Sequence, residues 1–398
     1  MYICFYVSTI VLYLVLRCFE NQDKMKRLYI ILITLLLCFC TAFRNIAMGN
    51  DTYAYYMHFE RMANADLGEL IENTINSITS SSNNANKDPG YSVLAKIAYT
   101  ILLGNYEIYQ FLIALLILSA IGYLVYNYVQ DFSGYLLSYC FYISIFYHYL
   151  PNSATRQSIA LGIFLWSAII WIKKRNIFFP LMMILIASFI HKSVLIGILP
   201  FLVMYMKNKN KLIIYTIIGT ALFFAMGSYL TVLMGNLINS ENYAAYVQSG
   251  YYERTGSRPF VYILQMLALF VLNLYKRQNL NEIPVNEQFI QVCFFLSIVF
   301  VPMILVDPSL IRLDAYFAIW GVVFIPYILE NFEKRTKHWQ IIYILLFVLT
   351  FGRPILSGVP TYKFKWEQMH LHKRYGEIRS TDQLPKEMPS QFEQVTIS

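Results

Sequence analysis

Charged residues are scarce in this sequence. Asp, Glu, Lys and Arg together make up 14% of the 398 residues, whereas soluble domains carry about 25%. Hydrophobic residues make up 58%, which is more than one soluble core can bury. The scarcity of charge excludes an ordinary soluble protein and predicts an all-α, polytopic integral membrane protein. The net charge of +8 requires no nucleic-acid partner, because Lys and Arg gather in the cytoplasmic loops of membrane proteins.

Motifs for metal ions and nucleotides are also lacking. The six cysteines lie in or beside apolar runs and show neither metal-ligand spacing nor a disulfide framework. The sequence contains no P-loop, no dinucleotide fingerprint and no nucleophile elbow. The expected cytoplasmic loops are too short for a nucleotide-binding domain. We therefore expect an activity that uses no metal ion, no nucleotide and no other cofactor.

Long apolar runs, by contrast, are abundant. A helix that crosses a bilayer needs about 17–25 residues, and the pattern predicts about 12 transmembrane helices, within a range of about 11–13. The candidate segments are residues 2–16, 28–43, 107–129, 133–150, 155–172, 177–190, 193–206, 212–235, 259–275, 288–306, 314–329 and 339–356. The first segment lacks the basic start and the cleavage site of a signal peptide, so we expect a retained helix.

Two regions are expected to depart from simple spans. Residues 91–103 are short and contain Lys96, which predicts a re-entrant or interfacial helix. Residues 177–206 include two apolar runs that would measure about 45 Å as one helix, which is too long for one span. Two short helices with an outer turn at His191 fit this length and the basic clusters on both sides. The polar residues 62–90 predict a loop.

The basic residues also predict an orientation. With the amino terminus outside, the basic clusters lie in inner loops and the outer basic residues are mostly single. We expect a single membrane domain over residues 1–356, a large external loop with the short helix over 44–106, an external loop over 236–258 and a polar tail over 357–398. The tail lies outside with twelve helices and inside with eleven, and the positive-inside rule accepts both arrangements.

Single arginines at the outer ends of helices are the most informative polar residues. Four lie there, where they do not set orientation and are costly to desolvate: Arg44, Arg156, Arg312 and Arg258. A guanidinium group binds phosphate in a bidentate manner, and the helix start that carries Arg156 and Gln157 adds a preference for anions. These residues are candidates for binding an anionic ligand. In the simpler interpretation each arginine reaches lipid headgroups or pairs with a nearby acid, such as Asp314 beside Arg312.

Candidate acid–base and sugar-binding groups lie on the same side of the membrane. Asp51, within GNDT, suits hydrogen bonding to hydroxyl groups or general-base catalysis, although a turn explains it equally well. Tyr55 and Tyr56 suit stacking on sugars or a place in the interfacial aromatic belt. His191 is a candidate because it lies beside a lysine in a membrane hairpin. Asp88, within DPGY, is interpreted as a turn and helix start.

Several motifs occur in an order that is similar to one family. FRN-x4-GNDT-x2-YY-x2-F is followed by DPGY, TRQSIALGIFL, ASFIHKSVLIGILP and IRLDAYF. Over about residues 28–365 this pattern resembles the EpsG branch of the Wzy-type polymerases, which build O-antigen, capsule or exopolysaccharide. The inserted residues 74–86 and the tail after Glu367 have no counterpart in the resemblance.

The resemblance implies a glycosyltransferase of the bacterial inner membrane. Such a polymerase transfers the growing glycan from undecaprenyl diphosphate to the non-reducing end of a new lipid-linked repeat unit at the outer face. The implied partners are undecaprenyl-diphosphate-linked oligosaccharide, membrane lipid, a flippase and a chain-length regulator. Asp51 or His191 would deprotonate the acceptor hydroxyl. The departing diphosphate and the substrate would be bound by Arg156 and Arg312, with Arg44, Gln157, Tyr55, Tyr56 and Tyr316 in support.

Other functions remain open from the sequence. A glycosyltransferase that uses a polyprenyl-phosphate sugar would place acids such as Asp51 and Asp88 around a metal ion in the first outer loop, and its activity would depend on that metal. A flippase or transporter for lipid-linked oligosaccharide would need polar residues through the membrane midplane, whereas here they gather at outer helix ends. A membrane acyltransferase with His191 as base is a further alternative.

Overall fold

The computed structural model describes residues 2–48, 51–79, 88–147, 149–222, 281–306, 311–330 and 363–366, together with residues 225 and 267. Within these ranges every helix or strand assigned is a helix, as the all-α prediction requires, and one isolated β-bridge joins Arg44 to Phe364. Three of the described helices are long and apolar enough to cross a membrane. The protein is therefore a multi-pass membrane protein, while the count of about twelve spans stays a prediction.

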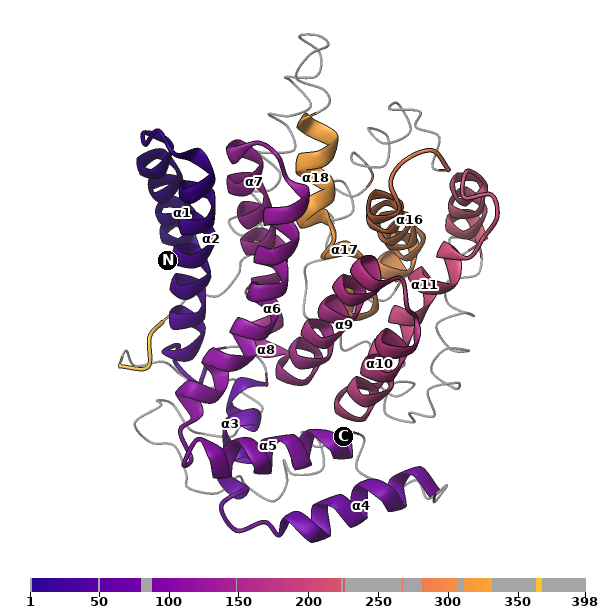
Figure 1. Ribbon diagram of the computed structural model, residues 1–398. Helices are drawn as coiled ribbons and strands as arrows, with labels where there is room; N and C mark the ends of the chain where they lie inside the picture. Colours follow the sequence, from indigo (N-terminus) through magenta and orange to yellow (C-terminus); the bar gives the residue numbers. More distant parts are fainter. Residues whose placement is uncertain are drawn as a thin grey trace.

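The three long helices pack side by side. They are α2 (Gln22–Ala42), α6 (Tyr106–Tyr128) and α9 (Thr155–Lys174), and α6 contacts both of the others (Figure 1). Asn21 and Asn105 cap α2 and α6 by accepting hydrogen bonds from the backbone three residues later. Ile113, Ile117 and Ile121 of α6 are buried, since the middle helix has a neighbour on each side.

Further helices belong to the described bundle, and several predicted spans are broken. The bundle also contains α1 (Tyr2–Arg17), α7 (Phe132–Tyr142), α8 (Leu150–Ser153), α10 (Phe178–Ile190), α11 (Ile198–Met204), α16 (Val285–Val306), α17 (Ile311–Ala318) and α18 (Gly321–Glu330). The predicted span 133–150 is divided because α7 continues into the π-helical turn η1 (Ile143–Tyr147). The predicted span 314–329 consists of α17 and α18, which are separate helices.

The predicted reversal within residues 177–206 occurs at His191. The backbone of His191 is extended, so α10 ends there and the 3-10 helix η2 (Lys192–Gly197) leads into α11. Phe201 of α11 packs on Phe164 and Trp171 of α9. The chain therefore returns along α9 toward the end of that helix that carries Lys174.

The segment between α2 and α6 contains three helices. They are α3 (Thr52–Arg61), α4 (Leu67–Thr79) and α5 (Pro89–Ile101), and α4 and α5 lie across one end of the bundle (Figure 1). We call this the α5 end. The short helix predicted over 91–103 is α5, but the predicted loop over 62–90 is wrong for α4. Asp66 caps α4 through the backbone N–H of Glu69 at 2.8 Å, and Leu67, Ile71 and Ile75 recur at the helical spacing.

The start of the predicted tail also reaches the α5 end of the bundle. Asn45 N–H donates to the carbonyl of Lys363 at 2.9 Å, and Lys365 N–H donates to the carbonyl of Phe43 at 2.8 Å. Lys363–Trp366 thus lies beside the carboxyl end of α2. The predicted loop over 236–258 and the predicted spans over 259–275 and 339–356 lie outside the described residues, apart from residue 267.

Candidate functional site

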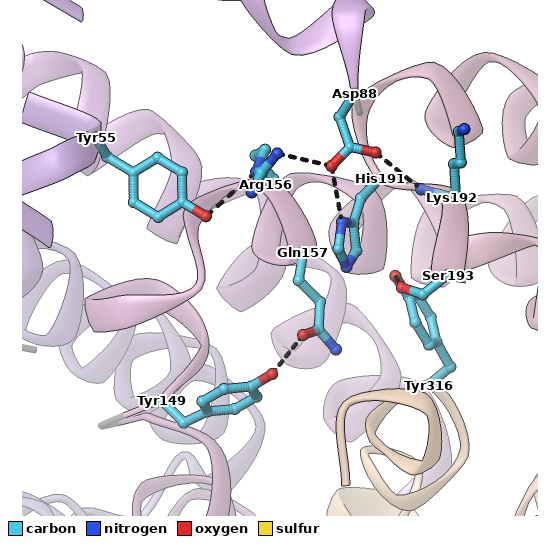
Figure 2. A network of polar contacts seen from close by, with 9 residues as sticks. All are labelled: Tyr55, Asp88, Tyr149, Arg156, Gln157, His191, Lys192, Ser193 and Tyr316. Carbon is cyan, nitrogen blue, oxygen red and sulfur yellow. Dashed lines mark hydrogen bonds and ion pairs between the residues drawn. The ribbon is translucent and has the colours of Figure 1, made fainter. Parts of the chain in front are cut away.

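Polar side chains from four separate elements meet at the α5 end of the bundle (Figure 2). Asp88 precedes α5, Arg156 and Gln157 belong to the first turn of α9, and His191 forms the turn after α10. Tyr316 lies on α17. Ionisable groups near a membrane are costly unless they are paired, so a cluster of this kind is a candidate site rather than a packing feature.

Asp88 lies at the centre of this cluster. Its side chain is only 4% exposed, and its Oδ2 accepts a hydrogen bond from Arg156 Nη1 at 2.8 Å. The same oxygen lies 3.5 Å from His191 Nδ1, and the backbone N–H of Lys192 donates to Oδ1 at 3.4 Å. A buried carboxylate needs such donors, and here two other elements supply them.

The glycine that follows brings Asp88 to this place. A Cβ atom on Gly90 would lie 2.6 Å from Cβ and 2.9 Å from the carbonyl oxygen of Phe189 on α10, so only glycine allows this approach. Pro89 at the first helical position suits the start of α5. The DPGY motif therefore acts as a contact between α5 and α10 as well as a helix start.

Burial and neighbouring groups shift the pKa values of both Asp88 and His191 below their usual values. Burial raises the pKa of Asp88, but His191, Arg156 and the Lys192 N–H outweigh it, so the pKa of Asp88 lies below its usual value. Burial lowers the pKa of His191, and Arg156 and Arg312 lower it further although Asp88 opposes them. At neutral pH the site therefore holds an ionised Asp88 and a neutral His191.

Neighbouring side chains fix the position of Arg156, but its side chain is not fully buried. Its Nε donates to Tyr55 Oη at 3.4 Å, its guanidinium lies 5.8 Å from the Tyr55 ring centroid, and its side chain is 19% exposed. Pairing with an acid, the simpler interpretation of this arginine, is therefore observed at Nη1. Among the described residues no group bonds to Nη2, which leaves part of the fork available to a ligand.

Gln157 connects the start of α9 to α17. Its Nε2 donates to the carbonyl of Arg312 at 2.6 Å, and its Oε1 accepts from the hydroxyl of Tyr149. The Arg312 side chain is exposed, and its charge acts on His191. Tyr316 is buried and its hydroxyl lies 3.0 Å from that of Ser193. Arg156 and Arg312 therefore belong to one connected group.

For three further predicted residues the structure gives other neighbours. Arg44 is 3% exposed and donates to the carbonyl of Thr41 at 2.8 Å and to Gln110 at 3.2 Å. Asp51 precedes α3 and is half-buried, and Tyr56 packs its ring on Tyr106 at 5.2 Å. Their assignment to the site stays a prediction.

The sequence interpretation missed the central position of Asp88 in the polar cluster. It also missed the contacts of Ser193 with Tyr316 and of Tyr149 with Gln157, because Tyr149 was interpreted as a belt or packing residue. The available signal was DPGY, which forms part of the family resemblance, but a turn accounted for that motif. His191 follows about 100 residues later, and nothing in the sequence indicated that the two segments meet.

A second histidine, His58, lies close enough to the cluster for Arg156 to act on its pKa. His58 of α3 stacks on Tyr91 at 5.1 Å, and its Nε2 lies 3.4 Å from Ser92 Oγ. Burial, with Arg156 and Arg61, lowers the pKa of His58 to about 4, so it is neutral at physiological pH.

The described part of the chain contains no group of three or more His, Cys, Asp or Glu side chains that could hold a metal ion, and metal independence stays a prediction.

Comparison with known proteins identifies one family. The model of the EpsG family matches residues 27–355, which confirms the resemblance carried by the motifs. No curated protein and no solved structure matches the chain.

Proposed function

The chain belongs to the EpsG family, and we propose that it polymerises a surface polysaccharide in the bacterial inner membrane. The family indicates a membrane polysaccharide polymerase, and the apolar helices place the chain in a membrane. In the proposed reaction the growing glycan leaves undecaprenyl diphosphate and joins the non-reducing end of a new lipid-linked repeat unit. The reaction takes place at the outer face, where a flippase delivers the units and a chain-length regulator limits the product.

The chemistry needs a base and a group that accepts negative charge. The acceptor hydroxyl oxygen attacks the anomeric carbon of the donor glycan, and its proton passes to the base. The bond between the anomeric carbon and the diphosphate oxygen breaks, and its electron pair leaves with undecaprenyl diphosphate. The glycosyl-diphosphate bond supplies the driving force, so no nucleotide is needed.

One observation supports the proposal most strongly: two arginines from different helices are connected through Gln157. Arg156 lies in the first turn of α9. The next residue, Gln157, donates a 2.6 Å hydrogen bond to the backbone carbonyl of Arg312. Preorganised cations and a helix start stabilise negative charge that develops on a leaving diphosphate. Asp88 pairs with Arg156 through Nη1, and the charge of Arg312 also acts within this group, on His191.

The state of Asp88 also argues against the metal-dependent alternative. A glycosyltransferase of that kind would present its acids to a metal ion, whereas Asp88 is buried and bonded to Arg156 and Lys192. The polar group at one end of the bundle likewise suits chemistry at a membrane face better than transport through the midplane.

Mass spectrometry of lipid-linked saccharides in a strain that lacks the protein tests the proposal. We expect complete single repeat units on undecaprenyl diphosphate in the outer leaflet, no long polymer, and recovery of polymer when the wild-type chain is returned. Repeat units that lack one sugar would instead indicate a glycosyltransferase acting earlier. Complete units confined to the inner leaflet would indicate transport.

A further inference from the structure

We propose that Asp88 is a positioning residue that makes His191 the general base of glycosyl transfer. Its carboxylate would fix the tautomer of His191 in which Nε2 accepts the proton of the acceptor hydroxyl, and the same oxygen would hold Arg156 beside it. The inference rests on the proposed function, and it selects His191 over Asp51 as the base.

The geometry determines which ring nitrogen carries the proton. An ionised carboxylate can only accept hydrogen bonds, so His191 Nδ1 must carry the hydrogen where it faces Asp88 Oδ2 at 3.5 Å. A neutral imidazole then has its lone pair on Nε2. That nitrogen points away from Asp88 in Figure 2 and bonds to no described residue. His191 is 21% exposed at its side chain, so a substrate hydroxyl can reach it.

The charges around His191 explain why a carboxylate is needed. Asp88 faces it from α5, Arg156 from α9, and Arg312 and Tyr316 lie on α17, while Lys192 is its neighbour in η2. The remaining neighbour, α11, carries no titratable side chain. Two arginines and burial keep the imidazole neutral, which suits a base, but they also oppose its protonation during the reaction. Among the described groups that act on His191, only Asp88 stabilises the imidazolium.

One oxygen of Asp88 fixes the position of the base, His191, relative to the anion-binding residue, Arg156. Arg156 Nη1 and His191 Nδ1 both meet Asp88 Oδ2. The base and the cation for the leaving group therefore have a fixed spacing. Asp51 lies before α3, where its carbonyl accepts from Tyr55 N–H at 3.0 Å; the contact with Asp88 Oδ2 that links a base to Arg156 is made by His191.

The pH dependence of elongation tests the proposal. Membranes that contain the full-length chain would be supplied with undecaprenyl-diphosphate-linked repeat units, and the elongation rate would be measured from pH 4 to pH 8. We expect the wild-type rate to rise through a single acid limb and then level off, because only neutral His191 accepts a proton. For Asp88→Asn we expect that limb to move to lower pH by about one unit and the plateau to fall at least about tenfold.

Matched variants separate positioning from folding. Asn is a good residue at a helix start, so Asp88→Asn should preserve α5, and Asp88→Glu should restore the wild-type limb and part of the plateau. Asp66→Asn makes the same change at the start of α4 and should alter neither quantity. Asp51→Asn should keep the limb, and His191→Ala should abolish it.

Three results would overturn the inference. A lower plateau with an unmoved limb in Asp88→Asn would reduce Asp88 to a structural role. A wild-type limb in His191→Ala would show that another group is the base. If the wild-type chain elongates no repeat units at any pH while those units are present and intact, the proposed function fails and the inference fails with it.

Discussion

The guanidinium of Arg156 has two kinds of neighbour, and they have opposite consequences. Asp88 neutralises it through Nη1, whereas Tyr55 positions it without removing its charge. Arg312 adds a second cation close enough to lower the pKa of His191. Two guanidinium groups and a helix start therefore lie in one group, an arrangement that favours a diphosphate over a neutral sugar.

Replacement of Arg156 should disable polymerisation. We expect Arg156→Ala to lose at least about 100-fold in elongation rate, since it removes a preorganised donor for the leaving group. Arg156→Lys should retain only part of the activity, because an ammonium group cannot form the bidentate fork. The amount of polymer in a complemented strain at equal protein level checks both variants. Arg27→Ala is the control, because Arg27 lies near the start of α2, away from the cluster. Full activity of Arg156→Ala would contradict the assignment.

The sequence allowed some of these residues to be selected and not others. Arg156, Gln157 and His191 lie at the ends of apolar runs, where a polar group is costly and a purely structural role is uncommon. Asp88 has a common one, a turn before a helix. Its proposed function depends on a contact between segments about 100 residues apart, and the local sequence gives no sign of that contact.

At the scale of elements, the approach of α5 to α10 controls the geometry of the cluster. We expect Gly90→Ala to lower elongation by about tenfold or more, because the added methyl group would meet Phe189 at 2.6 Å and push Asp88 away from His191. Gly68→Ala is the matched control, since its methyl group would meet only the Asp66 side chain at 3.0 Å. Equal elongation rates for the two variants at equal protein level would show that the close approach is unimportant for activity.

The bridge between Phe43–Asn45 and Lys363–Trp366 should contribute to stability through its backbone. We expect Lys365→Pro to reduce the free energy of unfolding by about 1–3 kcal/mol, since it removes the N–H that donates to Phe43. Lys365→Ala should cost less than about 1 kcal/mol, because it removes two exposed side-chain contacts: the ion pair with Glu107, in which the two side chains are 47% and 33% exposed, and the contact of Nζ with the Phe43 ring at 5.4 Å. Thermal unfolding of the full chain in detergent checks the order. A proline variant as stable as the alanine variant would contradict it.

Element boundaries were predicted least well where helices break. The apolar runs 133–150 and 314–329 read as continuous spans, since the π-helical turn at Ile143–Tyr147 and the gap between α17 and α18 have no marker in their hydropathy. In α4 the error was the reverse, because polar residues between Leu67, Ile71 and Ile75 concealed an amphipathic helix.

At the scale of the whole molecule, the composition was enough to predict an all-α membrane protein, and the order of motifs was enough to predict the family. The sidedness of the tail was left open, because charge counting accepted two arrangements. The bridge to Lys363–Trp366 places that part of the chain at the α5 end of the bundle, and the side of the membrane that this end faces stays a prediction.

Cysteine labelling should therefore place three positions on two sides. With the native cysteines replaced by serine, we expect an impermeant maleimide to label Asn64→Cys and Trp366→Cys in intact cells. Asn64 and Trp366 are both exposed and lie at the α5 end, whereas exposed Lys174 lies at the other end of α9. Lys174→Cys should react only after permeabilisation. If Trp366→Cys reacted only after permeabilisation, as expected for Lys174→Cys, then Asn64 and Trp366 would not lie on the same side of the membrane.

The central claim is that this chain joins lipid-linked repeat units without nucleotide or metal. The most direct measurement is the reaction of the purified full-length chain in liposomes with undecaprenyl-diphosphate-linked repeat units, with a metal chelator present and no nucleotide. We predict products of two and more repeats, with one undecaprenyl diphosphate released per linkage, and no products from Arg156→Ala. Intact single units after incubation with a folded wild-type chain, or elongation only when a polyprenyl-phosphate sugar and a metal ion are added, would contradict the claim.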